Sequence, residues 1–370
     1  MMRHRRFLDE YSLRDHLMHE TPAHVYYSSA YYKEPQAQDM NKKGWSGADL
    51  VFDVDADHIP TECKNDHDKW KCLDCGAEGG GFPPESCPSC GKKRIETTTW
   101  VCEKCLDVTK NEVFKLLDDY LIPDFGVSLN DVEICFSGHR GYHLHILTES
   151  MRGLTSDGRR EIADYVRGTG LDQKLHGFLV LNRNGPLIGP DIRDGGWRGR
   201  IVRSMYTYIS RCNVENMKTV IGSGSVAETL CRNRDRILEG ITRLPPSWVG
   251  LKGVGVERLS RIARASVKEI LCNIDERVTL DVKRLIRYPN TLHGKSGLKS
   301  SRITYNDLEG FDPLRDAVAF KNGIIKVYVR EAPRVRIGDH EVGPLKEAEV
   351  EVPKALGIYL ICKGVAEPRK

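Results

Sequence analysis

The sequence predicts an α+β protein with a mixed-sheet core, an inserted zinc-binding knob and a helical subdomain. Three observations lead to this expectation. Short apolar runs typical of strands alternate with segments of helical spacing, seven of the twelve cysteines lie between residues 63 and 105, and residues 206–275 are mostly helical in pattern. We therefore expect a core made of residues 1–60, 107–205 and 276–370, with insertions at 61–106 and 206–275.

The composition is that of a soluble globular protein. The 370 residues exceed the roughly 100–200 residues of one domain, and apolar residues make up 40% against 29% charged residues. The net charge of +4 argues only weakly for an anionic partner. The basic N-terminus has no apolar region or cleavage site behind it, and no stretch approaches the ~20 apolar residues of a membrane helix. We expect a soluble, cytoplasmic protein without a membrane partner.

The first candidate site is a pair of acids in an apolar run, Leu50-Val51-Phe52-Asp53-Val54-Asp55. In a strand, Asp53 and Asp55 point to the same face. Two such carboxylates can hold the pair of Mg²⁺ or Mn²⁺ ions that phosphoryl transfer uses. An Asp-x-Asp pattern is also common at solvated strand ends. The apolar residues ahead favour the metal interpretation, because acids that interrupt a buried strand are costly unless paired or metal-bound.

The second candidate is a glycine-containing turn. Residues 132–136 and 142–147 have the pattern of two strands, and Ser137-Gly138-His139-Arg140-Gly141 joins them. Glycines let the backbone approach a ligand, while Ser, Arg and His side chains donate to phosphate oxygens. An ordinary hairpin turn would explain the same pattern.

The third candidate is Asp281, which we expect on a second acidic strand of the mixed sheet, with a basic segment behind it. Residues 283–302 contain six Lys or Arg, one His and no acid. Such a segment is usually a solvated face. Here Gly294 and Gly297 suggest instead a loop that holds a triphosphate or a template backbone.

The cysteine-rich segment predicts two structural zinc sites. One closed set is Cys63, His67, Cys102 and Cys105; the other, of zinc-ribbon spacing, is Cys72, Cys75, Cys87 and Cys90. Sets that exchange Cys-x-x-Cys pairs between the two sites use the same eight ligands, and the sequence does not choose between these arrangements. Because protein would fill all four positions of each site, the metal would be structural.

Taken together, the Asp-Val-Asp strand, the Ser-Gly-x-Arg-Gly-x-His turn and the Asp-(x5)-Arg-x-Pro-x-x-x-His-x-Lys-x-Gly segment resemble the small, catalytic subunit of archaeal and eukaryotic DNA primases. The resemblance implies a metal triad of Asp53, Asp55 and Asp281. It implies triphosphate contacts from Ser137, Arg140, His143, Arg287 and His293. His139 stands where eukaryotic members carry Arg, so its contact stays open. The family has one zinc site, so residues 72–90 look like an added ribbon.

By the same resemblance we expect a nucleotidyltransferase that makes primers de novo from nucleoside triphosphates on single-stranded DNA, together with a primase large subunit. A repair-type primase-polymerase of the same superfamily is one alternative, and a non-catalytic zinc-dependent nucleic-acid-binding protein is another. Residues 251–259 also resemble a helix-hairpin-helix element, although a glycine turn between core helices explains them equally well.

Overall fold

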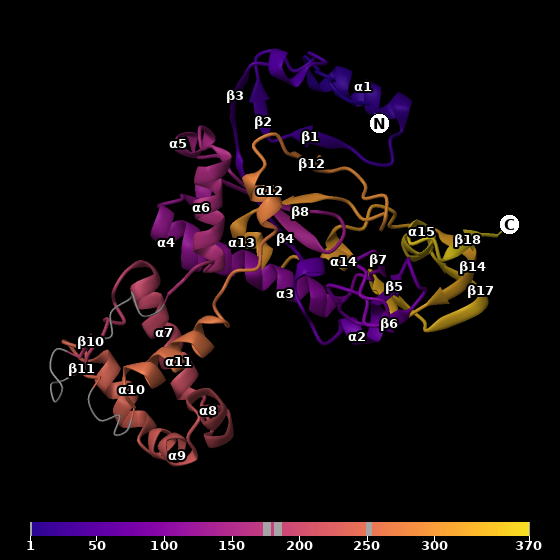
Figure 1. Cartoon of the computed structure of the whole chain (residues 1–370). Helices are drawn as coiled ribbons and strands as arrows, with labels where there is room; N and C mark the ends of the chain where they lie inside the picture. Colours follow the sequence, from indigo (N-terminus) through magenta and orange to yellow (C-terminus); the bar gives the residue numbers. More distant parts are fainter. Residues whose placement is uncertain (1, 173–178, 181–186, 249–253, 370) are drawn as a thin grey trace. The chain divides into compact units, whose positions relative to one another are not determined.

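The computed structural model describes residues 2–172, 179–180, 187–248 and 254–369. The chain divides into two units (Figure 1). The first unit, which we call the sheet unit, contains Met1–Phe114, Val127–Ala163 and Asn273–Lys370, and the second, the helical unit, contains Lys115–Gly126 and Asp164–Cys272. Within the described ranges, no helix combines the length and the apolar character that a membrane crossing requires.

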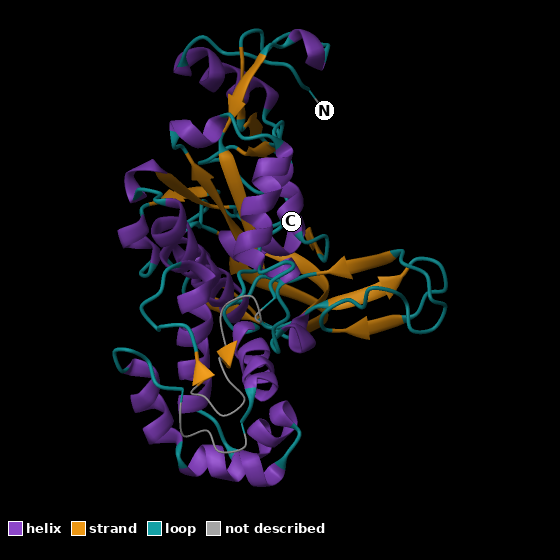
Figure 2. Cartoon of the chain, turned by 60° about the vertical axis from the view of Figure 1, so that its left-hand side comes forward, coloured by secondary structure: helices purple, strands orange, loops and turns teal. Residues whose placement is uncertain are grey.

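The sheet unit holds most strands of the chain, drawn in orange in Figure 2. Its strands are β1 (Tyr26–Ser28), β2 (Ala30–Tyr32), β3 (Trp45–Ala48), β4 (Leu50–Asp55), β5 (Lys69–Cys72), β6 (Glu78–Gly80), β7 (Ile95–Thr98), β8 (Val132–Phe136), β9 (Gly141–Ile146), β12 (Leu285–Arg287), β13 (Ser301–Ile303), β14 (Ile324–Ala332), β15 (Val335–Ile337), β16 (His340–Val342), β17 (Leu345–Pro353) and β18 (Ala366–Pro368). Its helices are α1 (Glu10–Glu20), η1 (Met40–Lys42), η2 (Ala56–His58), α2 (Lys64–His67), α3 (Glu103–Phe114), η4 (Leu129–Asp131), α5 (Glu149–Arg152), most of α6 (Ser156–Arg167), α12 (Glu276–Leu280), α13 (Tyr305–Leu308), α14 (Pro313–Asp316) and α15 (Lys354–Cys362).

The central sheet has four strands in the order β13-β8-β9-β4. Leu50, Phe52 and Val54 of β4 have no exposed surface, because alternate residues of the strand point into the core. Helix α3 packs against β4 and β9. The α+β class and the strands expected at 50–55, 132–136 and 142–147 are confirmed.

Two details of the expected sheet are wrong. All strand pairs described in the central sheet are antiparallel, so this sheet is not mixed. Asp281 does not lie on a strand: it directly follows helix α12, because residues 276–280 form one short helical turn after the N-cap residue Asp275. Consequently only one of the two acidic segments belongs to the sheet.

The helical unit contains η3 (Lys115–Leu121), which is a π-helical segment, together with α4 (Ile122–Phe125), α7 (Gly196–Ser210), α8 (Val214–Ile221), α9 (Gly224–Arg232), α10 (Arg234–Thr242), α11 (Val256–Val267) and the two-residue strands β10 (Leu179–Val180) and β11 (Leu187–Ile188). Helix α7 packs against α11, and the Ser204 and Ser266 hydroxyls are 3.0 Å apart. The unit therefore begins earlier in the chain than the expected insertion at 206–275, because α7 shares a core with the later helices. Residues 251–253 of the suggested hairpin lie outside the described residues.

Candidate active site and metal centres

Strands β4 and β9 place two carboxylates beside a histidine. Asp53 lies opposite His143 in the antiparallel register, and Asp55 lies opposite Gly141. The His143 Nε2 atom is 3.6 Å from Asp53 Oδ1. A Cβ atom on Gly141 would come within 2.3 Å of the Val54 carbonyl oxygen, so only glycine allows the two backbones this close approach. The glycine turn therefore lies directly beside the strand that carries the two acids.

A cavity of about 270 Å³ opens beside these acids. Gly138 has a positive φ of 84°, and a Cβ atom there would lie 2.8 Å from His293 Cβ, so the turn also packs tightly on the basic loop. The cavity brings together most of the expected site residues. Its lining is Tyr26, Asp53, Asp55, Asp57, Thr97, Thr99, Ser137, His139, His143, Arg284, Leu285, Ile286, Arg287, His293 and Lys295.

The surroundings of the carboxylates oppose their ionisation. Burial, followed by the charges of Asp55 and Asp275, raises the pKa of Asp53 well above its usual value. Burial and the neighbouring charge of Asp57 raise the pKa of Asp55 to about 6. Arg284 acts in the opposite direction at Asp53 without cancelling the shift. Buried, mutually repelling carboxylate oxygens fit hard divalent cations such as Mg²⁺ or Mn²⁺, whose charge would stabilise the ionised forms.

The structure does not bring Asp281 to this cluster. Asp281 follows α12 and is absent from the described lining of the cavity. Its charge acts on Tyr32 and on Arg159, whose guanidinium donates to backbone carbonyls just ahead of β4. Asp281 therefore lies near the beginning of β4, whereas Asp53 and Asp55 lie near its end.

Asp275 stands beside the acids instead. Its backbone N–H donates to the Asp53 carbonyl oxygen at 2.9 Å, and its charge helps to raise the pKa of Asp53. Asp275 is not among the site residues expected from the sequence, because it falls at the end of the expected helical insertion at 206–275. The signal that the sequence offers for Asp275 is that an Asp is a preferred first residue of a helix. In the structure its carboxylate accepts from the Arg277 N–H at the start of α12.

The opposite side of the cavity presents hydrogen-bond donors. Arg287 is 5% exposed and donates to the Tyr26 hydroxyl at 3.0 Å, with its guanidinium 4.8 Å from the centre of the Tyr26 ring. Burial and the charge of Arg287 lower the pKa of His293 to about 3, so this imidazole is neutral. Since His293 Nδ1 accepts from the Lys295 N–H at 3.2 Å, its proton lies on Nε2, which is then a donor.

Two further histidines of the cavity carry unsatisfied atoms. His139 Nε2 and His143 Nδ1 are buried and have no hydrogen-bond partner among the described residues. The rings of His139 and His293 stack at 5.1 Å. Ser137 Oγ accepts from the backbone N–H groups of His139 and Gly141, each at 3.3 Å, which leaves its own hydrogen available. Unpaired buried polar atoms of this kind point to a ligand.

Arg140 has a different place from the one expected. It has no exposed surface, and its Nη1 atom donates to both carboxylate oxygens of Asp68 at 3.0 and 2.8 Å. Its Nε atom lies 3.3 Å from Asp57 Oδ1. Ser137, His139 and Asp57 line the cavity, whereas Arg140 is absent from the described lining. In this structure the Arg140 guanidinium lies against two carboxylates, of which Asp57 lines the cavity and Asp68 does not.

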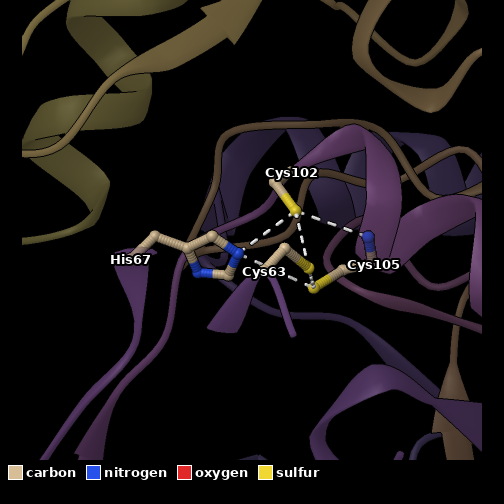
Figure 3. Close-up of side chains that lie close together, drawn as sticks. All are labelled: Cys63, His67, Cys102 and Cys105. Atoms are coloured by element: carbon tan, nitrogen blue, oxygen red, sulfur yellow. Dashed lines mark hydrogen bonds between the residues drawn. The ribbon is translucent and has the colours of Figure 1, made fainter. Parts of the chain in front are cut away.

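The first cysteine group has the geometry of a closed metal site. Cys63 precedes α2 and His67 is its last residue, while Cys102 precedes α3 and Cys105 lies in its first turn. The four side chains point toward one another (Figure 3). The Sγ atoms of Cys63 and Cys105 are 3.5 Å apart, and His67 Nε2 is 3.2 Å from Cys102 Sγ. These separations suit a tetrahedral zinc site, in which Zn–S bonds of about 2.3 Å place sulfurs about 3.8 Å apart. His67 Nδ1 is 2.7 Å from Asp68 Oδ1, a typical outer partner of a zinc-bound histidine.

The second group brings together Cys72, Cys75, Cys87 and Cys90. The Sγ atoms of Cys72 and Cys90 are 3.7 Å apart, and those of Cys75 and Cys87 are 3.6 Å apart. The eight side chains thus form the two sets given first in the sequence analysis, and not the swapped sets. Both groups lie in the knob, whose three strands pair in the order β6-β5-β7.

Comparison with known proteins assigns the chain to a family. A sequence model described as DNA primase small subunit matches residues 92–305. The DNA primase small subunit PriS of Methanococcoides burtonii is 34% identical over 384 residues, which span 99% of this chain and 88% of that protein. The chain belongs to the DNA primase small subunit family. PriS of Cenarchaeum symbiosum is also 34% identical, over 368 residues spanning 99% of this chain and 88% of that protein, and PriS of Haloarcula marismortui is 33% identical over 390 residues spanning 100% and 88%.

Membership of the primase small subunit family confirms the resemblance found in the three motifs. The relatives match the chain over nearly its full length, so the similarity includes the cavity and both units. The family name implies an enzyme of the nucleotidyltransferase type that serves DNA replication.

Proposed function

We propose that this chain is the catalytic subunit of a DNA primase, which joins nucleoside triphosphates into short primers de novo on single-stranded DNA. One observation supports this proposal most. A single cavity brings partly buried acids with raised pKa values together with Arg287, His293, His143 and Ser137. Two-metal phosphoryl transfer requires acids that hold the cations and, close to them, groups that hold the phosphates.

On the acidic side, we assign Asp53, Asp55 and Asp275 to binding two Mg²⁺ or Mn²⁺ ions. When bound, such ions favour ionisation of the primer 3′-hydroxyl and neutralise the triphosphate. The chain's own contribution is to fix the carboxylates: β4 holds Asp53 and Asp55 on one face, and the N–H of Asp275 is tied to the Asp53 carbonyl. Asp275 replaces Asp281 in the triad expected from the sequence.

On the opposite side, Arg287 and the neutral His293 bind the triphosphate. Arg287 is held in place by Tyr26, so little side-chain freedom is lost when phosphate binds. His293 offers its Nε2–H, and Ser137 offers its hydroxyl hydrogen. Bound phosphate would favour protonated histidines, because a nearby negative charge stabilises the imidazolium form. The site thus recognises the charge of the nucleotide and not its base.

Two other functions fit parts of the chain. A repair-type primase-polymerase would share the acids and the glycine turn, and a non-catalytic zinc protein would share the knob. The names of the relatives, DNA primase small subunit PriS, favour the primase over both. The same names support a separate large subunit as partner, and we propose that this chain acts in such a complex. Both cysteine groups would hold structural Zn²⁺.

The test is primer synthesis by the acid variants. Purified protein, unprimed single-stranded DNA, labelled nucleotides and Mg²⁺ or Mn²⁺ should give de novo product. Asp53→Asn, Asp55→Asn and Asp275→Asn should each lower the rate at least about a hundredfold, which corresponds to about 2.7 kcal/mol of lost transition-state stabilisation.

Asp281→Asn is the matched control, because it neutralises an acid of the same segment outside the cavity. It should retain the wild-type rate within about threefold, since it removes no cavity group. An inactive Asp281→Asn beside an active Asp275→Asn would restore the triad expected from the sequence. Product formation by all four variants would refute the metal assignment, and the absence of product from the wild type would refute the primase proposal.

A further inference from the structure

The ribbon, by which we now mean the knob's sheet of β5, β6 and β7, reaches the cavity that holds Asp53 and Asp55. Thr97 and Thr99 are among the residues that line the cavity, and they are the members of that lining that come from residues 61–106. Thr97 belongs to β7 and lies opposite Trp70 of β5. The inserted module is therefore one wall of the site in addition to the central sheet and the basic loop.

Two of three consecutive threonines face the cavity. Side chains of a strand point to opposite faces in turn, so Thr97 and Thr98 of β7 point to opposite faces, and Thr99 directly follows the strand. Thr97 and Thr98 are both exposed and Thr99 is partly exposed, but Thr98 is absent from the lining. Neither the Thr97 nor the Thr99 hydroxyl has a hydrogen-bond partner among the described residues. Two free donors thus face the same space as His293 and Lys295.

Both ends of this strand are anchored. At its start, Ile95 lies opposite Cys72, and the Leu73 N–H donates to the Arg94 carbonyl at 2.9 Å, so the second cysteine group fixes the register. At its end, Lys363 donates to the Thr99 carbonyl oxygen, and the buried Trp100 donates its N–H to Asp68 at 2.9 Å. Anchored donors lose little freedom when they bind a ligand.

We propose that Thr97 and Thr99 donate hydrogen bonds to phosphate oxygens of the incoming nucleotide, so that the ribbon forms part of the nucleotide site. This proposal rests on the proposed function and extends it to a module that the sequence predicted to be only structural. A hydroxyl suits this task because it donates to an anionic oxygen without adding charge to a cavity that already contains Arg287 and Lys295. Phosphates of a nucleic-acid strand share this chemistry, so the test separates the two sources.

The test compares four variants of the zinc-loaded full chain. Thr97→Val and Thr99→Val, alone and combined, remove the hydroxyl and keep a β-branched side chain that suits a strand. Thr98→Val makes the same change on the other face of β7 and is the matched control. Dissociation constants are measured by calorimetry for a non-hydrolysable nucleoside triphosphate and by fluorescence anisotropy for single-stranded DNA, with zinc content and melting temperature recorded for every variant.

We expect the double variant to bind the nucleotide about ten- to a hundredfold more weakly, as is usual when hydrogen bonds to a charged group are lost. Its DNA affinity, zinc content and melting temperature should equal those of Thr98→Val. Unchanged nucleotide affinity would overturn the proposal, and so would weakened DNA binding with normal nucleotide binding, which would assign the hydroxyls to strand phosphates. Because nucleotide affinity is read directly, weakened binding in a chain that makes no primers would uphold this inference while refuting the proposed function.

Discussion

Arg140 illustrates how the neighbours of one residue decide its role. The Nη1 atom of Arg140 donates to Asp68, and its Nε atom lies 3.3 Å from Asp57, a residue that lines the cavity. Although burial opposes ionisation, hydrogen bonding with His67 and the charge of Arg140 keep the pKa of Asp68 below its usual value. Arg140 therefore links the first cysteine group to the edge of the cavity. We assign it a positioning role, because its side chain is held by Asp68 and lies beside Asp57 at the edge of the cavity.

The first prediction concerns this buried ion pair. Arg140→Met should lower the free energy of unfolding by about 3–5 kcal/mol, because it leaves the Asp68 charge buried without its partner. Urea denaturation of the zinc-loaded protein measures this. Arg302→Met is the control: Arg302 is 59% exposed and pairs with Glu133 at 2.9 Å, so its loss should cost less than about 1 kcal/mol. Equal stabilities of the two variants would contradict the assignment of Arg140.

The second prediction concerns pH. Because the pKa of Asp55 is raised to about 6 by burial and by Asp57, the folded Mg²⁺-free protein binds more protons than the unfolded chain between about pH 4 and 6. The stabilising contribution of protonated Asp55 is complete below about pH 4 and is lost as the pH rises through 6. Mg²⁺ favours the ionised form, so it should raise the melting temperature more at pH 8 than at pH 5.

The control for this effect is Asp55→Asn, which cannot ionise and should show a smaller Mg²⁺ effect at pH 8. Scanning calorimetry at both pH values, with and without Mg²⁺, measures the four melting temperatures of each protein. An equal Mg²⁺ effect at pH 5 and pH 8 in the wild type would show that proton and metal do not compete at this carboxylate.

At the scale of elements, the knob is organised by its two cysteine groups and not by an apolar core. One group joins α2 to α3, and the other closes the ribbon of β5, β6 and β7. Gly79 allows the ribbon to pack closely, because a Cβ atom there would lie 2.5 Å from the ring of Trp70. A small module without a large core depends on its metal ions for its fold.

The third prediction is therefore a zinc content of two ions per chain, measured by elemental analysis. Cys90→Ser should lose one ion and raise the KM for nucleotide, because the ribbon that carries Thr97 and Thr99 loses its closure. Cys362→Ser, which changes a cysteine outside both groups, should keep two ions. A wild-type content of one ion would contradict the ribbon site.

At the scale of the whole molecule, the chain forms two units that each have their own contacts. The cavity residues and both cysteine groups belong to the sheet unit. The helical unit has a separate core, in which Ile201, Met205 and Leu259 have no exposed surface. Removing the metal ions from the two cysteine groups should therefore loosen the sheet unit and leave the helical unit folded.

The fourth prediction tests this independence by hydrogen exchange. Removing zinc with a chelator should increase amide exchange in α2, in β5 to β7 and in the turn around Arg140, because these segments contact the cysteine groups. Exchange in α7 and α11 should stay within about twofold of the zinc-loaded protein, because those helices pack on each other in the other unit. Faster exchange in both units would show that the protein opens as one cooperative body.

The sequence by itself determined the features that depend on local periodicity and spacing. Alternation along β4 placed Asp53 and Asp55 on one face, and the spacing of the cysteines gave the members of both groups. It also supplied the family, because the motifs are linear. These features are predictable since strand geometry and ligand spacing act over a few residues.

Only the tertiary structure decided which side chains meet across long stretches of sequence. Arg140 pairs with Asp68, 72 residues earlier, and this partner holds its guanidinium beside the first cysteine group. Asp275 lies beside Asp53 while Asp281 does not, because one turn of α12 separates their positions. The ribbon brings Thr97 to the cavity through strand pairing that no local pattern contains. The physical reason is that a buried charge or an unpaired hydroxyl acts through the groups around it, and those groups come together only when the chain folds.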